Sequence, residues 1–150
     1  MQEQQPQMPP VRSIHFRLDY IHAERLPIPH SPSQTLNIMF NVNVLNTNVT
    51  VHDTIVEIPF AVNISSMPSL VSISLRGCLA IQFENGKDAS DIAKLISEGK
   101  VPEPINVILM QYVILEVNIL LRELGLPPML SPIPQPAAQK PDRITELHYA

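Results

Sequence analysis

The side chains in this chain that could do chemistry are a few histidines and one cysteine. They are His15, His22, His30, His52, His148 and Cys78. None of the histidines lies at a metal-ligand spacing from the cysteine or from a carboxylate. His52 and Asp53 are adjacent, so on a strand their side chains point to opposite faces and cannot act together. We expect Cys78, which follows Gly77 in a strand-like stretch, to be a buried and unreactive thiol.

No other reactive pattern occurs in the sequence. A glycine-rich phosphate loop, a nucleophile elbow and a pair of catalytic carboxylates are all missing from the 150 residues. The sequence therefore predicts no catalytic residue, no cofactor and no metal. We interpret the protein as a non-enzyme, with a small-ligand enzyme left as a rival hypothesis.

Composition narrows the class of protein further. A formal charge of −4 with scattered basic residues argues against direct nucleic-acid binding. A single cysteine excludes an internal disulfide framework and is compatible with a reducing compartment. The start MQEQQPQMPP lacks the basic and apolar segments of a secretory signal. We expect a cytoplasmic protein with one domain over residues 12–134, a disordered tail over 1–11 and a flexible tail over 135–150.

The first half of the chain alternates between apolar and polar residues, as half-buried strands do. The first predicted strand covers residues 13–20, with Ile14, Phe16, Leu18 and Tyr20 on one face. Three more strands are predicted over residues 36–46, 49–64 and 70–83. The strand over 49–64 has a bend at Pro59, and the strand over 70–83 has a bulge or close backbone approach at Gly77. Short connections after residue 46 predict an antiparallel meander.

Two helices follow the strands. Asp88 or Ser90 can cap a short helix that ends at Gly99, and Pro102 and Pro104 open a long one over about 105–124. The order indicates an α+β domain, in which a short and a long C-terminal helix pack on one face of a four-stranded antiparallel sheet.

The long helix is apolar on nearly every side, and this is its most informative property. Its few polar residues, Asn106, Gln111, Glu116 and Asn118, are spread around the axis. They make a membrane span costly, and one small sheet can cover only one face of such a helix. We therefore expect no membrane insertion and a homo-oligomer, a dimer or tetramer, in which a second chain covers another face.

The order of elements resembles the SecB family of export chaperones, and the spacing of leucine and proline residues near the C-terminal end strengthens the likeness. Tyr112 stands near the start of the long helix, Leu126-Pro127 lies at the family's spacing beyond it, and Leu130 and Pro132 follow. Upstream, residues 76–81 (RGCLAI) are similar to the family's glycine-led last strand. The resemblance covers about residues 12–134, as a pattern of apolar positions and of the prolines and glycines between elements.

The sequence departs from the family at several positions. Ile114 and Leu115 replace the family's Arg-Glu pair, and Gln111 replaces its proline. The family docks a motor ATPase through acidic residues on the exposed sheet face. Asp19 and Glu24 could serve as such partner-docking residues, but Ser72 and Ser74 stand on the last strand where acids would be needed.

The resemblance implies an oligomeric holdase, a chaperone that binds apolar segments of unfolded or partner polypeptides, with a possible role in protein export. We expect its client surface to comprise Met39, Phe40, Phe60, Leu126, Met129, Leu130 and Ile133. The expected oligomer interface comprises Leu109, Tyr112, Val113, Glu116 and Leu120. An alternative is an oligomeric adaptor that holds one specific protein, such as a ribosome-associated or toxin–antitoxin component.

Overall fold

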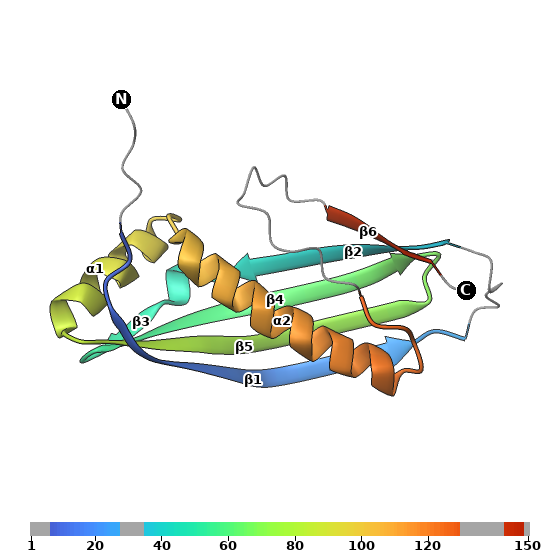
Figure 1. Cartoon of the computed structure of the whole chain (residues 1–150), viewed down its shortest axis with the longest axis horizontal. Coiled ribbons are helices and arrows are strands. Elements are labelled where there is room, and N and C mark those ends of the chain that lie inside the picture. Colours follow the sequence, from blue (N-terminus) through green and yellow to red (C-terminus); the bar gives the residue numbers. More distant parts are fainter. Residues whose placement is uncertain (1–6, 28–34, 130–142, 149–150) are drawn as a thin grey trace, which may run out of the picture.

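A long, twisted antiparallel sheet forms the body of the molecule (Figure 1). The computed structural model describes residues 7–27, 35–129 and 143–148, with side chains described for 7–27 and 37–129. Within these residues the strands are β1 (Val11–Arg25), β2 (Thr35–Val44), β3 (Thr50–His52), β4 (Ile55–Met67), β5 (Val71–Phe83) and β6 (Arg143–His148). The α+β class with an antiparallel sheet and two helices after the main strands is confirmed.

The strand order corrects the expected simple meander. The sheet runs β1-β5-β4-β2-β6, with β3 paired to β4 at the side. Strands β2, β4 and β5 are consecutive neighbours, as the short connections predicted. Strand β1 instead pairs with β5, so the chain crosses from one side of the sheet to the other between β1 and β2. Alternation within a strand carries no information about such a long-range partner.

The predicted third strand is two strands joined by a tight turn. Asp53 adopts a positive φ of 54°, and β3 pairs back onto β4 from Thr50↔Glu57 to His52↔Ile55. On the same side of β4, pairing with β2 begins only at Phe60. Pro59 lies between these two ladders, at a position where a missing N–H leaves no ladder bond unmade.

A bulge in β1 changes which side chains face the helices. Leu18 pairs with Gly77 and Tyr20 with Arg76, so Asp19 is the extra residue. Tyr20 therefore lies on the opposite face from Leu18, which corrects the predicted alternation. The expectation for Gly77 is confirmed, because a Cβ there would overlap the backbone of Arg17 and the ring of Phe60.

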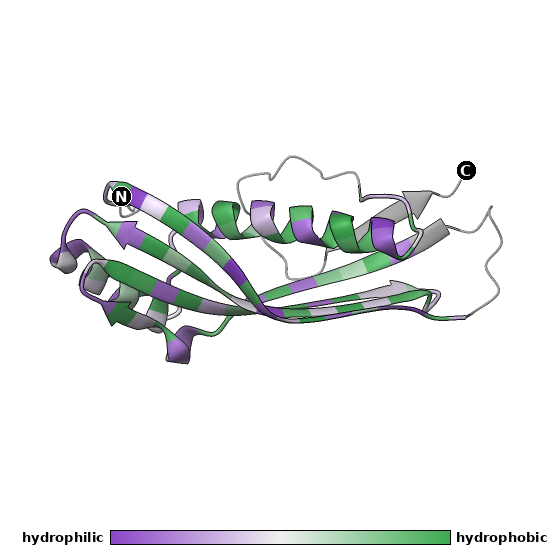
Figure 2. Ribbon diagram, turned by 90° about the horizontal axis from the view of Figure 1, so that it is seen from below, coloured by the Kyte–Doolittle hydropathy of each residue, from purple (hydrophilic) through white to green (hydrophobic). Residues whose placement is uncertain are grey.

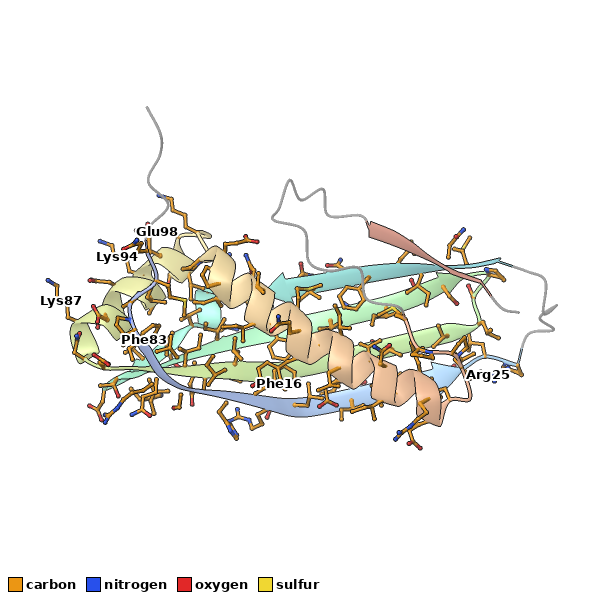
Figure 3. The ribbon with its side chains drawn as sticks, in the orientation of Figure 1. Phe16, Arg25, Phe83, Lys87, Lys94 and Glu98 are labelled. Carbon is orange, nitrogen blue, oxygen red and sulfur yellow. The ribbon has the colours of Figure 1, made fainter. Side chains whose placement is uncertain are left out.

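The shorter helix, α1 (Gly86–Ser97), is capped at its N-terminus by Asn85 and not by the predicted Asp88 or Ser90. The Asn85 side chain accepts a hydrogen bond from the Asp88 backbone N–H at 2.9 Å, and its amide donates to the Asp88 carboxylate. Gly99 ends the helix in a left-handed conformation with φ of 82°, as predicted. Figure 3 shows Lys87, Lys94 and Glu98 projecting outward from α1.

The longer helix, α2 (Glu103–Glu123), has the predicted boundaries within two residues. Pro104 lies in its first turn, and Gly125 follows its end with φ of 71°. Arg25 at the end of β1 donates from Nη1 to the Leu124 carbonyl at 3.2 Å (Figure 3). A cation at this position satisfies a free carbonyl and lies at the negative end of the helix dipole.

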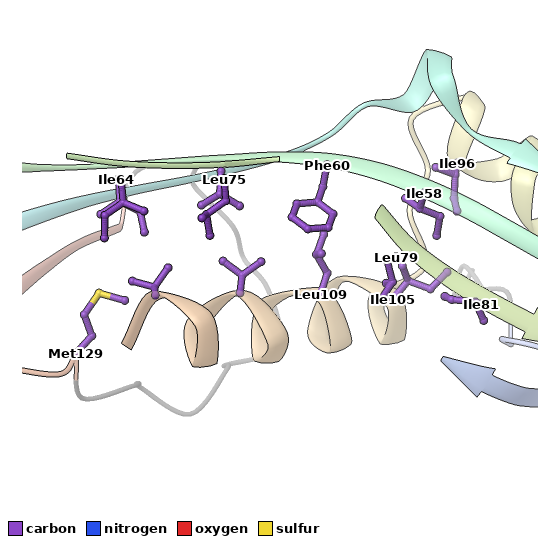
Figure 4. Packing of buried hydrophobic residues seen from close by; sticks show 14 of the residues in the cluster. Ile58, Phe60, Ile64, Leu75, Leu79, Ile81, Ile96, Ile105, Leu109 and Met129 are labelled. Atoms are coloured by element: carbon purple, nitrogen blue, oxygen red, sulfur yellow. The ribbon is translucent and has the colours of Figure 1, made fainter. Parts of the chain in front are cut away.

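One hydrophobic core holds both helices against the same sheet face (Figure 4). On β4 the alternate residues from Val56 to Ile64 are at most 1% exposed. Ile96 of α1 and Leu109 of α2 belong to the same buried cluster. The helices therefore cover one face of the sheet, as predicted, and leave the other face to solvent or partners.

Part of the predicted C-terminal tail belongs to the sheet. Strand β6 pairs antiparallel with β2 from Thr35↔His148 to Phe40↔Arg143. Residues 143–148, within the predicted tail over 135–150, therefore form an edge strand of the sheet.

Candidate partner-binding surfaces

The inner face of α2 is fully used by the chain's own core. Its buried residues are Ile105, Leu109, Val113, Val117 and Leu121, at a regular four-residue spacing. Leu109 and Val113, which were expected at an interface with a second chain, belong to this row and are at most 1% exposed within this one. Apolar residue type alone could not separate the face that meets the sheet from the face that does not.

Tyr112 also has a partner inside the chain. Its ring stacks on Phe16 of β1 with centroids 5.0 Å apart, and Phe16 in turn stacks on Phe60 of β4 at 5.2 Å. The two remaining predicted interface residues, Glu116 and Leu120, are half-buried on the sheet side of α2. The predicted interface residues thus lie mainly on the face that packs on the sheet.

The opposite face of α2 carries the exposed apolar residues. Leu115 is 57% exposed and Ile119 is 39% exposed, and both lie away from the buried row. Ile108 continues the same face at helical spacing and is half-buried. Figure 2 shows apolar positions recurring along the whole length of α2. We call Ile108, Leu115 and Ile119 the outer stripe. Large exposed apolar groups in a row indicate an interaction surface.

By length and composition α2 could also cross a membrane, and it is the one helix among the described residues that could. Its buried row against the sheet is what a core helix of a compact domain shows.

The segment after α2 folds back onto the helix and closes the core. The Met129 backbone N–H donates to Asn118 Oδ1 at 2.8 Å, and the Leu126 N–H donates to the Leu121 carbonyl at 2.9 Å. Leu126 is 5% exposed and Met129 8%. The expected open client surface at these two residues is therefore corrected to a buried position. Leu130 and Ile133, which complete that prediction, lie outside the described residues.

The predicted sheet contributors divide between core and surface. Phe60 is 1% exposed and belongs to the core, so it cannot contact a client in this fold. Met39 is 48% exposed on the outer sheet face, where Met67 of β4 lies diagonally opposite it and is 58% exposed. Phe40 is half-buried on the helix side of β2. Of the predicted client residues with described side chains, only Met39 and Phe40 are accessible.

The acidic side chains on β1 are paired within their own strand. The Asp19 carboxylate accepts a hydrogen bond from Arg17 Nε at 2.7 Å, and His22 Nε2 lies 3.1 Å from the Glu24 carboxylate. All four side chains are about half exposed. Each acid thus has a neighbour two residues away on β1, an arginine for Asp19 and a histidine for Glu24, and both carboxylates stay about half exposed.

The same outer face carries a pair that sequence reasoning missed. The Arg76 guanidinium lies over the Tyr20 ring at 4.5 Å, a cation–π contact between β5 and β1. The bulge at Asp19 brings the two residues to one face, and bulges leave no signal in a simple alternation. Arg76 pairs with Tyr20, which follows Asp19 in the chain, so a basic group lies near this one of the two predicted docking residues.

The candidate reactive residues do not form a reactive centre. His52 ends β3 while Asp53 occupies the turn, and the nearest carboxylate to the His52 ring is Glu57 at 4.0 Å on the exposed surface. Cys78 is 6% exposed, and burial raises the pKa of its thiol, with a further contribution from the nearby Glu57. Within the described parts of the chain, no three His, Cys, Asp or Glu side chains cluster as metal ligands would.

The fold has a counterpart among solved structures. The Mycobacterium tuberculosis SecB-like chaperone Rv1957, solved in complex with a ChAD peptide from the Rv1956 HigA1 antitoxin, matches with a TM-score of 0.60. The match covers 84% of this chain and 89% of that one at 12% sequence identity. No protein-family model matches the sequence, and no curated protein matches it. The structural match shows a SecB-like fold, as the sequence pattern suggested.

Proposed function

We propose that this protein is a non-enzymatic, soluble chaperone that assembles as a homo-oligomer and holds apolar segments of other polypeptides. The observation that carries the proposal is the outer stripe of α2 in a fold of the SecB-like type. A monomer gains nothing from leaving Leu115 and Ile119 in water on a helix already anchored by its other face.

The outer stripe is the part of this proposal that concerns assembly. Burying it against a second copy would cover α2 on both sides, which is what its apolar character requires. The same contact explains why the exposed positions are leucine and isoleucine and not lysine or glutamate. Strand β1, whose outward side has no partner among the described strands, lies at the free edge of the sheet and offers a further pairing surface between copies.

The client surface in this proposal centres on β2. Met39 and Phe40 remain accessible, and Met67 enlarges the apolar area on the outer face. Methionine side chains are flexible and polarisable, and so suit partners of varied shape. Binding an unfolded client in this way shifts its equilibrium by mass action and needs no nucleotide.

Aggregation suppression by the full chain tests the proposal. Several chemically unfolded proteins are diluted with and without this protein, and light scattering is followed. Protection of several clients supports a general holdase. The double variant Met39→Ser and Met67→Ser should weaken protection, while the control Lys87→Ser and Lys94→Ser changes exposed polar residues on α1, away from β2, and should not. Failure to protect any client would overturn the holdase proposal.

A specific adaptor is the second candidate. The structural relative was solved with a peptide from one antitoxin, and this favours a single dedicated partner as the alternative to general clients. Protection of one client alone would support the adaptor. Because Ser72 and Ser74 stand on β5 where acidic residues would be needed, we do not extend the proposal to docking of an export motor.

A further inference from the structure

We propose that the outer edge of β2 is a strand-addition site for an extended polypeptide, and that β6 is the chain's own resident segment, which such a polypeptide displaces. This inference rests on the proposed function and names the geometry of its client contact. Met39 and Phe40 are neighbours on one strand, so their side chains lie on opposite faces of the sheet. A single client segment can contact both only by running along the edge between them.

The edge of β2 is only partly covered. On its inner side β2 pairs with β4 from Asn37↔Met67 to Val44↔Phe60. On its outer side β6 pairs only as far as Phe40↔Arg143. Among the described strands, nothing pairs with the outer side of residues 41–44. Free backbone donors and acceptors on an edge are a template for another extended chain, so an incoming segment can start at residues 41–44 and extend toward Thr35.

The resident strand, β6, is held more weakly than strands that pair on both sides. It is six residues long and, in the described structure, pairs with β2 alone. A terminal strand bound by one ladder opens at a lower free energy than strands with neighbours on both sides. Each ladder hydrogen bond contributes only about 1 kcal/mol net, and an added strand replaces those bonds one for one.

The register shows which client sequences would compete best. In the backbone register, β6 pairs Arg143 with Phe40 and Thr145 with Ile38, so residues of polar type occupy two positions opposite apolar residues of β2. Further along, Val42 and Val44 are half-buried on the helix side of β2. A segment with apolar residues at alternate positions would match this side better than β6 does, because cross-strand apolar pairs stabilise a sheet. The expected ligand is therefore an extended segment with an apolar residue at every second position.

Three full-length versions of the protein test the displacement. Wild type is compared with a loosened version, Thr145→Pro and Glu146→Pro, and a tightened version, Arg143→Val and Thr145→Val. Neighbouring N–H groups on a strand point to opposite sides, so one of the two prolines removes a donor that faces β2. The probe is a fluorescent peptide of residues 141–150 carrying Arg143→Val and Thr145→Val, followed by fluorescence anisotropy.

We expect the loosened version to bind the probe about tenfold more tightly than wild type, as it would if β6 leaves the edge of wild type in about one molecule in ten. The tightened version should bind more weakly than wild type. Equal affinity in all three would overturn the inference. Cooperative unfolding of each version by urea confirms that the remaining fold is intact.

Backbone methylation of the probe separates strand addition from side-chain contact. Two peptides carry N-methyl groups on alternate residues, one on the odd positions and one on the even positions. Only one set of N–H groups faces β2, so one peptide should lose binding and the other should retain it. An equal effect of the two methylation patterns would overturn the inference.

The aggregation assay keeps this inference distinct from the proposed function. If the full chain protects several clients while the probe affinity is the same in all three versions, strand addition at β2 is overturned and the holdase proposal stands. If the chain neither protects clients nor binds the probe, both are overturned.

Discussion

Tyr112 of α2 lies nearly parallel to Phe16 of β1, with ring planes 7° apart and centroids at 5.0 Å. Phe16 stacks in turn on Phe60, so three rings join the long helix to an edge strand and a central strand. The stack lies on the side of α2 that packs on the sheet, together with the buried row that includes Leu109 and Val113. With α2 in this orientation, Leu115 and Ile119 are left exposed.

Removing the Tyr112 ring should loosen the contact between α2 and β1. We expect Tyr112→Ala to lower the free energy of unfolding by about 2–3 kcal/mol, because it leaves a cavity and removes an aromatic contact. Urea denaturation measures this loss. Tyr112→Phe keeps the ring and is the control, expected within about 0.5 kcal/mol of wild type. Equal losses in the two variants would show that the hydroxyl, and not the stack, is important.

Ser66 organises the turn between β4 and β5 from a buried position. It is 2% exposed; its Oγ accepts from the backbone N–H groups of Leu70 and Val71 and donates to the Pro68 carbonyl. Ser66→Ala should lower the free energy of unfolding by about 1–3 kcal/mol, since two buried donors lose their acceptor. The neighbouring Ser65→Ala should cost less than about 0.5 kcal/mol. Thermal unfolding of both variants provides the comparison.

The outer stripe should control assembly. We expect light scattering to show wild type as a dimer or tetramer, and the double variant Leu115→Glu and Ile119→Glu as a monomer that still unfolds cooperatively. Charges at these positions cannot be buried between helices without a large desolvation cost. Gln111→Glu adds a charge to the same exposed face without removing an apolar group, and it should leave the oligomer largely intact. A monomeric wild type would contradict the proposed assembly.

The Cys78 thiol should make the free energy of unfolding depend on pH. Burial raises the pKa of its thiol above the ordinary value of 9.0. Above pH 9 the unfolded chain therefore loses this proton before the folded chain does, so the folded state binds more protons and stability falls as pH rises. The free energy of unfolding should drop more between pH 8 and pH 10 in wild type than in Cys78→Ala.

Alkylation gives a second measurement at the same residue. Cys78 is the chain's one cysteine, so a thiol reagent reports on this site alone. At pH 8 the folded protein should react more slowly than the protein in urea, because the thiolate is the reactive form and is rarer in the fold. Equal rates would show that the thiol is exposed to solvent.

The boundaries of α2 were predictable from local chemistry. A proline lies in the first turn of α2, and Gly125 follows its last turn. Both residues act on the backbone within a few positions, so neighbouring residues alone decide where the helix begins and ends. The alternation that marked β2, β4 and β5 is equally local, and their order followed from short connections.

The candidate surfaces were less predictable, for a physical reason. Leu109 and Leu115 are the same residue type on one helix, yet Leu109 is buried at 1% and Leu115 is 57% exposed. The difference arises from which face of α2 packs on the sheet, and the sheet residues that this face meets lie far away in the chain. Likewise, the extra residue Asp19 moved Tyr20 to the face of Arg76.

Residue types and spacing thus determine this protein's elements, its class and the apolar excess of α2, because helix ends and strand alternation depend on near neighbours. The tertiary structure alone decides which face of α2 is left uncovered, which strand β1 pairs with and which edge β6 covers. These features depend on contacts between residues far apart in the chain, which neither helix ends nor strand alternation specify.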